Sequence, residues 1–189
     1  MRAKILTIFV LVCAFMTTMS AQNYRVEPNG IGPVKIEANY KTLPESVAGL
    51  YDSRTLLEEY DELEDMYVYT VYFKLNGEDM LYAKAYESGE IFEVRANSKS
   101  LCTKSGVYQN MPVSEFLKVP GVSVQVYPEV FAIIFQIDGV DVGIDFNYYS
   151  DAGQKKFDKA MNTGVAPKFV ASDFNSDAVI FLGGFNIWY

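Results

Sequence analysis

The chain has 189 residues, half of them hydrophobic, and its 24 acidic and 16 basic residues give a formal net charge of −8. Such an acidic surface attracts neither nucleic-acid phosphates nor anionic lipids, since those contacts are built from Lys and Arg. The chain contains no histidine. This removes the usual general base, the commonest transition-metal ligand and every Ser-His or Cys-His nucleophile pair.

The first 21 residues have the pattern of a secretory signal peptide. Arg2 and Lys4 precede an apolar run and a small polar stretch. The run is shorter than the roughly 20 apolar residues that span a bilayer. We therefore expect an exported chain, periplasmic or extracellular, with no transmembrane segment in its mature part, residues 22–189. That part keeps one cysteine, Cys102, which can form no intramolecular disulfide and which we expect to be structural.

Two segments after residue 40 carry helical signals. In residues 42–52, Thr42 and Glu45 have the spacing of a capping box, and Pro44 lies in the first turn. Residues 55–67 place four apolar side chains at helical spacing: Leu56, Leu57, Tyr60 and Leu63. We therefore predict two short helices here.

A three-stranded meander is predicted next. Its strands are at 67–75, 80–86 and 91–96. Asn76-Gly77 and Ser88-Gly89 lie at the joints, where tight hairpins need glycine at positive φ.

The same order recurs in the second half of the chain. A helix is predicted over 110–121, with Asn110 as its N-cap and Pro120-Gly121 at its end. The strands that follow are at 122–126, 130–137 and 140–146. Asp138-Gly139 joins the last two and is the strongest short hairpin signal in the chain.

Together these elements predict an α+β fold of two antiparallel three-stranded meanders, each preceded by short helices. A helix at 154–161 and a strand at 178–189 complete the chain. One interpretation is a duplicated α-β-β-β unit. Residues 22–189 are expected to form a single domain, with 30–98 and 99–189 as candidate subdomains. The expected core contains Phe73, Phe92, Val94, Phe116, Ile133, Phe135, Val142 and Ile144.

Three aspartates in an apolar stretch, Asp138, Asp141 and Asp145, are the first candidates for catalytic carboxylates. Asp141 and Asp145 alternate with apolar residues, so a strand would place both on its polar face, about 13 Å apart. The two carboxylates of a glycosidase lie about 5–9.5 Å apart. We therefore interpret these residues as the solvated face of a strand and assign no catalytic residue.

A calcium site built from oxygen ligands is conceivable near the C-terminus. Asp173, Asn175 and Asp177 have the first three spacings of an EF-hand loop. The position that requires glycine is Ala178, and the position of the bidentate glutamate is Gly184. We therefore predict a polar turn, and neither a metal site nor a cofactor.

Aromatic residues are abundant, with 14 Tyr and 13 Phe. Most fall at strand positions where core packing is expected. Tyr148 and Tyr149, which leave a predicted strand, are expected to be partly exposed, and a tyrosine-rich surface can bind sugars or proteins. These two are the binding residues that we predict.

The stretches IGPVKIEANYKTLPESVAGLYD and TKSGVYQNMPVSEFL resemble lead-in segments of small exported bacterial proteins of unknown function. In those proteins a glycine-containing turn precedes a short helix and a β-meander. The organisation is similar to that of SmpA/OmlA-like outer-membrane-assembly lipoproteins and of β-lactamase-inhibitor-like proteins. The resemblance implies a non-catalytic protein binder and assigns no functional residue.

Three functions therefore stay open. The first is an exported, non-enzymatic binding or interaction protein of the bacterial cell envelope, whose partner is an unknown protein or envelope component. The second is a glycan-acting hydrolase that uses Asp and Glu carboxylates from separate strands, which would have to meet in one cleft. The third is a small outer-membrane β-barrel, although the expected strands are shorter than the roughly 9–11 residues that such barrels use.

Overall fold

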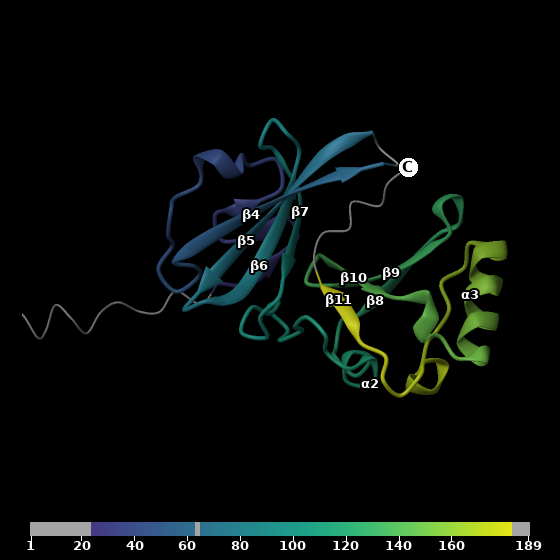
Figure 1. Cartoon of the computed structure of the whole chain (residues 1–189). Helices are drawn as coiled ribbons and strands as arrows, with labels where there is room; N and C mark the ends of the chain where they lie inside the picture. The colour runs from purple at the N-terminus through teal and green to yellow at the C-terminus, as the bar shows by residue number, and fades with distance from the viewer. Residues whose placement is uncertain (1–23, 63–64, 183–189) are drawn as a thin grey trace, which may run out of the picture.

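In the computed structural model of the chain, residues 24–62 and 65–182 are described (Figure 1). The signal peptide predicted for residues 1–21 lies outside the described residues. The last part of the strand predicted at 178–189, with Gly184, also lies outside them.

The first large sheet has four antiparallel strands in the order β4-β5-β6-β7 (Figure 1). They are β4 (Ser53–Asp61), β5 (Met66–Leu75), β6 (Glu78–Ala85) and β7 (Ile91–Ala96). The three strands predicted for the first meander are therefore confirmed. At the joint between β5 and β6, Asn76 and Gly77 have φ of 53° and 83°, as a type I′ hairpin turn requires.

The two helices predicted ahead of this meander are wrong. Residues 42–52 contain the end of the 3-10 helix η1 (Tyr40–Thr42), turns and an isolated antiparallel bridge between Val47 and Tyr51. The segment predicted as the helix at 55–67 is instead mostly strand β4, paired with β5 along its whole length from Ser53 to Asp61. Helix propensity is a weak prior, and the cross-strand contacts to β5 override it.

The second large sheet is also antiparallel, in the order β11-β10-β9-β8. Its strands are β8 (Ser123–Tyr127), β9 (Ala132–Ile137), β10 (Val140–Ile144) and β11 (Ile180–Leu182). The predicted second meander is therefore confirmed. Asp138 and Gly139, with φ of 55° and 79°, make the expected hairpin turn.

Helices flank this second sheet. They are α2 (Val113–Phe116), η2 (Pro128–Val130), η3 (Phe146–Tyr148), α3 (Asp151–Thr163) and η4 (Ala171–Asp173). The helix predicted over 110–121 is thus a single turn. Its predicted N-cap is wrong, because Pro112 is the N-cap and Asn110 has a φ of 62°. In Figure 1, α3 stands beside the sheet on the side away from β4 to β7.

A small antiparallel sheet opens the described chain. Its strands are β1 (Val26–Glu27), β2 (Gly30–Ile31) and β3 (Val34–Lys35). The chain then runs along the start of β7, where Glu37 N–H donates to the Ile91 carbonyl and Ile91 N–H donates to the Ala38 carbonyl, both at 2.8 Å. This segment therefore covers part of the β7 edge of the first large sheet. The opposite edge of that sheet is β4.

One continuous cluster of buried side chains joins all three sheets. Six of the eight predicted core residues are buried: Phe73, Val94, Phe116, Ile133, Phe135 and Val142. Phe92 and Ile144 are only half-buried. The mixed α+β fold is confirmed, whereas the duplicated α-β-β-β unit is not, because the first sheet gains a fourth strand where that unit needs a helix.

Within residues 24–62 and 65–182, no helix is both long enough and apolar enough to cross a membrane.

Candidate functional site

The three aspartates singled out in the sequence have separate structural partners. Asp138 accepts hydrogen bonds from the Ser105 backbone N–H at 2.6 Å and from its hydroxyl at 3.0 Å. Asp141 is half-buried and accepts from the Gln136 amide at 2.7 Å. Asp145 accepts from the Asn147 backbone N–H at 2.8 Å and so caps η3. Asp141 therefore lies on strand β10 as predicted, whereas Asp145 lies beyond the end of β10, so the prediction that the two share one strand face is wrong.

The Asp138 contacts predict a pH-dependent contribution to stability. Burial acts to raise the pKa of this carboxyl, but hydrogen bonds from Ser105 and Thr103 and the charge of Lys104 outweigh it and hold the pKa below its ordinary value. A carboxyl whose folded-state pKa lies below its unfolded value stabilises the fold above about pH 4, and this contribution is lost as the pH falls through the folded-state pKa.

We therefore expect Asp138→Asn to lower the melting temperature at neutral pH, and the difference from the native protein to shrink in acid. Thermal melts of both proteins across a pH series measure this. Asp177→Asn, in an exposed turn, is the control. A difference that stays constant down to about pH 2 would contradict the linkage.

The two tyrosines predicted as binding residues differ in exposure. Tyr148 is half-buried, as expected. Tyr149 is only 4% exposed, so its expected exposure is wrong. Its ring packs against Phe157 and Phe169, each at 5.6 Å between centroids, and against Phe174 at 4.8 Å. Burial raises the pKa of its hydroxyl. Tyr149 is thus a core residue beneath α3.

The predicted polar turn at 173–178 also has structural partners. Asp173 is buried and accepts from the Lys156 ammonium at 2.6 Å and from the Val170 backbone N–H at 2.7 Å. The Asn175 amide donates to the Asn147 carbonyl at 3.1 Å. Among residues 24–62 and 65–182, no three His, Cys, Asp or Glu side chains are grouped so that they could hold a metal ion.

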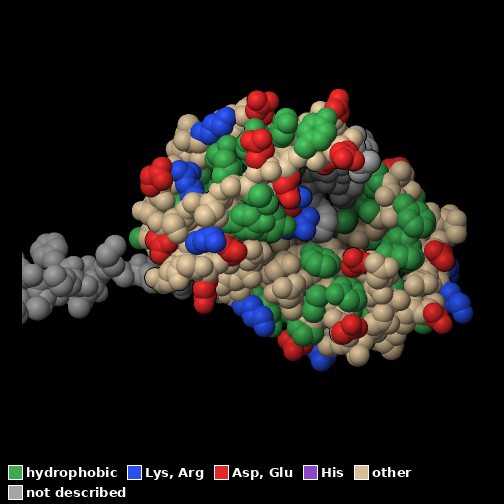
Figure 2. All heavy atoms as spheres, in the orientation of Figure 1, with side chains coloured by type: hydrophobic (Ala, Val, Ile, Leu, Met, Phe, Trp, Pro, Cys, Tyr) green, Lys and Arg blue, Asp and Glu red, His purple; other side chains and the backbone are tan. Residues whose placement is uncertain are grey.

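An unpredicted feature is the exposed edge strand β4. Seven of its nine residues are exposed, and Leu56, Leu57 and Tyr60 are 54%, 44% and 50% exposed although they are apolar or aromatic. In the described part of the chain, only β5 pairs with β4, so its other edge faces outward. Apolar and acidic side chains lie next to one another over this region in Figure 2.

A small pocket lies at the beginning of this strand. It has a volume of about 240 Å³ and is lined by Tyr40, Lys41, Glu45, Arg54, Thr55, Leu56 and Val71. Its lining therefore combines two cations and one carboxylate with an apolar wall. A second described cavity, of about 560 Å³, lies by the small sheet and contains one carboxylate, Glu27, which pairs with Lys35 at 3.3 Å.

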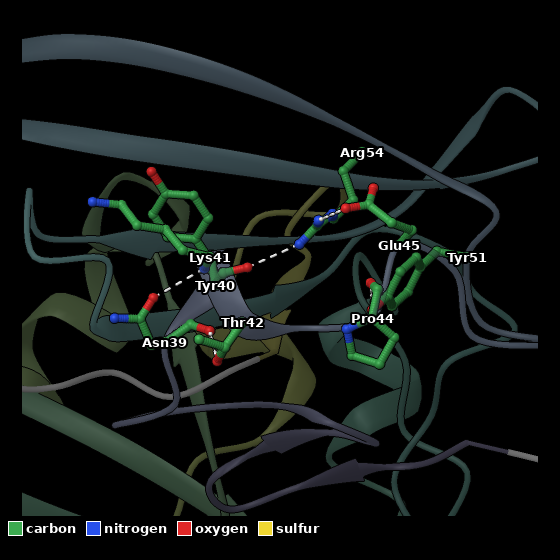
Figure 3. Close-up of polar contacts among 8 residues, drawn as sticks. All are labelled: Asn39, Tyr40, Lys41, Thr42, Pro44, Glu45, Tyr51 and Arg54. Carbon is green, nitrogen blue, oxygen red and sulfur yellow. Dashed lines mark hydrogen bonds and ion pairs between the residues drawn. The ribbon is translucent and has the colours of Figure 1, made fainter.

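Arg54 organises the smaller pocket (Figure 3). Its guanidinium donates to the Tyr40 carbonyl at 2.8 Å and to the Glu45 carboxylate at 3.0 Å. The Arg54 side chain is 17% exposed, whereas that of Glu45 is 95% exposed. An ion pair with one fully hydrated partner contributes little, about 0–1 kcal/mol, so another carboxylate can replace Glu45 at modest cost.

The loop below Arg54 is held by local hydrogen bonds. Asn39 caps η1 by accepting from the Lys41 backbone N–H at 2.9 Å, and the Lys41 ammonium donates to the Glu87 carbonyl at 2.7 Å. The buried Tyr51 hydroxyl donates to the Pro44 carbonyl at 2.9 Å. Burial is the main cause that raises the pKa of this hydroxyl. The lower wall of the pocket is therefore preformed.

Sequence reasoning missed this site because it assigned residues 55–67 to a helix. A signal was present: Thr55 and Tyr60 suit a strand, and the acidic residues Asp61, Glu62 and Asp65 come before the strongly predicted strand at 67–75. Pairing as a hairpin would have placed Arg54 opposite Phe73, as the structure does.

The fold and site thus define an α+β protein with an outward-facing edge strand and a cationic pocket at its start. No protein-family model matches the chain, and no curated protein matches its sequence. Among solved structures, the chain is similar to the uncharacterized protein YfeY from Escherichia coli, at 11% identity and a TM-score of 0.44, over 84% of this chain and 99% of that one. A likeness this weak carries no functional argument.

Proposed function

We propose that the protein is an exported, non-enzymatic interaction protein of the cell envelope that docks an extended segment of another protein on β4. The observation that carries the proposal is the edge strand itself, nine residues long, with Leu56, Leu57 and Tyr60 in solvent. An extended peptide can add to such an edge through backbone hydrogen bonds, while its side chains fill nearby pockets.

The length of β4 supports the proposal that this edge strand binds a partner strand. Edges without a partner are usually short or interrupted by proline or a bulge, because an exposed strand can pair with other chains. β4 pairs with β5 in unbroken register over all nine residues. Its charged residues, including Glu58 and Glu59, oppose pairing with a second acidic copy and leave the edge available to a strand of complementary charge.

Neither of the two cavities described above has a lining that suits glycoside hydrolysis. Each of the two described cavities contains a single carboxylate, Glu45 in one and Glu27 in the other. Both carboxylates are paired with cations. Glycoside hydrolysis needs two carboxyl groups about 5–9.5 Å apart across one cleft. The signal peptide that the sequence predicts at residues 1–21 supports an envelope location in this proposal.

Substitution of Leu56 by lysine tests the proposal. We expect the native protein to retain a partner from an envelope extract and Leu56→Lys to lose it, because lysine on an exposed edge opposes strand addition. Val165→Lys, at a side chain that is 67% exposed in the segment after α3, is the matched control. Amide hydrogen exchange should slow in β4 when the partner is bound. Equal retention by all three proteins would contradict docking on β4.

A further inference from the structure

We propose that the larger of the two cavities, beside the small sheet, binds a small organic anion, a flat apolar body that carries one carboxylate or phosphate group. The cavity has a volume of about 560 Å³, and sites for small molecules measure roughly 300–1,000 Å³. It shares no residue with β4. The inference therefore goes beyond the proposed docking function and does not depend on it.

Three charged side chains of the small sheet line one part of this cavity. Val26 of β1 is buried, so its neighbours Arg25 and Glu27 point to the opposite, outer face, where both are exposed. Glu27 and Lys35 pair with Gly30 from either side, and the Lys35 ammonium lies 3.3 Å from the Glu27 carboxylate. The lining thus has two cations and one carboxylate, although the whole chain has a formal net charge of −8.

Arg25 supplies the cation that is available to a ligand. Among residues 24–62 and 65–182, no carboxylate lies within ion-pair distance of its guanidinium. The Lys35 and Glu27 side chains are 40% and 54% exposed, and such an exposed pair contributes little stability. A guanidinium binds carboxylates and phosphates through paired N–H groups. An anionic group at Arg25 would therefore gain charge-assisted hydrogen bonds without displacing another partner.

Apolar side chains complete the lining of the cavity: Tyr24, Pro33, Pro44 and Val47. The Tyr24 ring packs on Gly32, where a Cβ atom would come within 2.7 Å of the ring atom Cδ1. Gly32 also has a φ of 57°, so its conformation and this contact both favour glycine. Tyrosine and proline rings present flat apolar surfaces, which suit a ligand with a flat apolar body.

The loop that carries Pro44 and Val47 is held in place by a core residue. The hydroxyl of Tyr51, which is 1% exposed, donates to the Pro44 carbonyl at 2.9 Å (Figure 3). The Val47 N–H donates to the Tyr51 carbonyl at 2.8 Å, and the Tyr51 N–H donates to the Val47 carbonyl at 3.0 Å. This wall is therefore formed before a ligand binds, which lowers the free energy that ordering would cost on binding.

Naphthoate is the probe, because it joins a flat aromatic body to one carboxylate, and naphthamide is its neutral control of the same shape. Titrations of the purified protein are followed by backbone amide chemical shifts, which should change mainly in residues 24–35 and 44–47. We expect naphthoate to bind about tenfold more tightly than naphthamide, since hydrogen bonds to a charged group are stronger. Naphthyl phosphate, titrated beside naphthoate, shows which acidic group binds more tightly.

The variant Arg25→Gln tests the cation at an exposed position, where the fold should be kept. It should weaken naphthoate binding about tenfold, to the affinity of naphthamide, and leave naphthamide binding unchanged. Lys118→Gln makes the same change in net charge at an exposed position just after α2. This matched control should bind both probes as the native protein does.

The variant Glu27→Gln gives a result that misfolding cannot imitate. Removing the competing carboxylate should tighten naphthoate binding roughly two- to fivefold, the range of an exposed ion pair, and leave naphthamide binding unchanged. Val47→Thr keeps the shape of the side chain but places a hydroxyl in the apolar wall. It should therefore weaken both probes to a similar extent.

Equal affinity of the native protein for naphthoate and naphthamide would overturn the inference. So would an Arg25→Gln protein that binds naphthoate as tightly as the native one, or the absence of binding by either probe at millimolar concentration. None of these results bears on docking at β4, because Leu56→Lys tests that function on a separate surface.

Discussion

Truncation of Phe116 to alanine should destabilise the protein by about 3–5 kcal/mol, the usual cost of removing a fully buried phenylalanine. Phe116 is 0% exposed and ends the single helical turn α2. Its ring packs edge-to-face on Phe135 of β9 at 5.8 Å between centroids. One aromatic side chain therefore docks α2 on the second sheet, and a helix of four residues has almost no stability of its own.

Thermal melts measure this effect. For a chain of this length, each kcal/mol shifts the melting temperature by about 2–4 °C, so a loss of roughly 6–20 °C is expected. Lys118→Ala, at an exposed position two residues later, is the control and should stay close to the native value. Equal melting temperatures for the two variants would mean that α2 is not packed on its sheet.

Most strands could be predicted from the sequence because their signals are local. Asn76-Gly77 and Asp138-Gly139 fixed two hairpin turns, and the apolar runs beside them located β5, β6, β9 and β10. The edge strand β4 could not be predicted in this way. Leu56, Leu57 and Tyr60 fit a helical stripe, and only their pairing with β5, a contact between separate segments, decides for a strand.

The candidate site could not be predicted because it depends on that same strand. Arg54 and Glu45 are nine residues apart in the chain, and their contact follows from the loop that returns from η1 to β4. Tyr149 shows the opposite case. Its position after a strand suggested exposure. In the structure its ring packs against Phe157 of α3 and against Phe174, which follows η4.

The substitution Gly153→Ala should destabilise the protein, although glycine to alanine inside a helix usually stabilises by about 1 kcal/mol. Gly153 lies in the first turn of α3 and is buried. A Cβ atom at this position would overlap the backbone carbonyl oxygen of Asp173. That oxygen accepts a hydrogen bond from the Ser150 N–H at 2.9 Å, so backbone, not a flexible side chain, would have to move.

Moving η4 away from α3 would also disturb the buried carboxylate of Asp173, which is held at 2.6 Å from the Lys156 ammonium. Overpacking of this kind typically costs about 1–3 kcal/mol. Asn162→Ala, at an exposed position near the end of the same helix, should remain within about 0.5 kcal/mol of the native protein. Denaturant unfolding of the two variants compares them directly. A Gly153→Ala protein as stable as the native one would show that α3 and η4 do not touch at this glycine, and that the Asp173 contacts to α3 are not tightly packed.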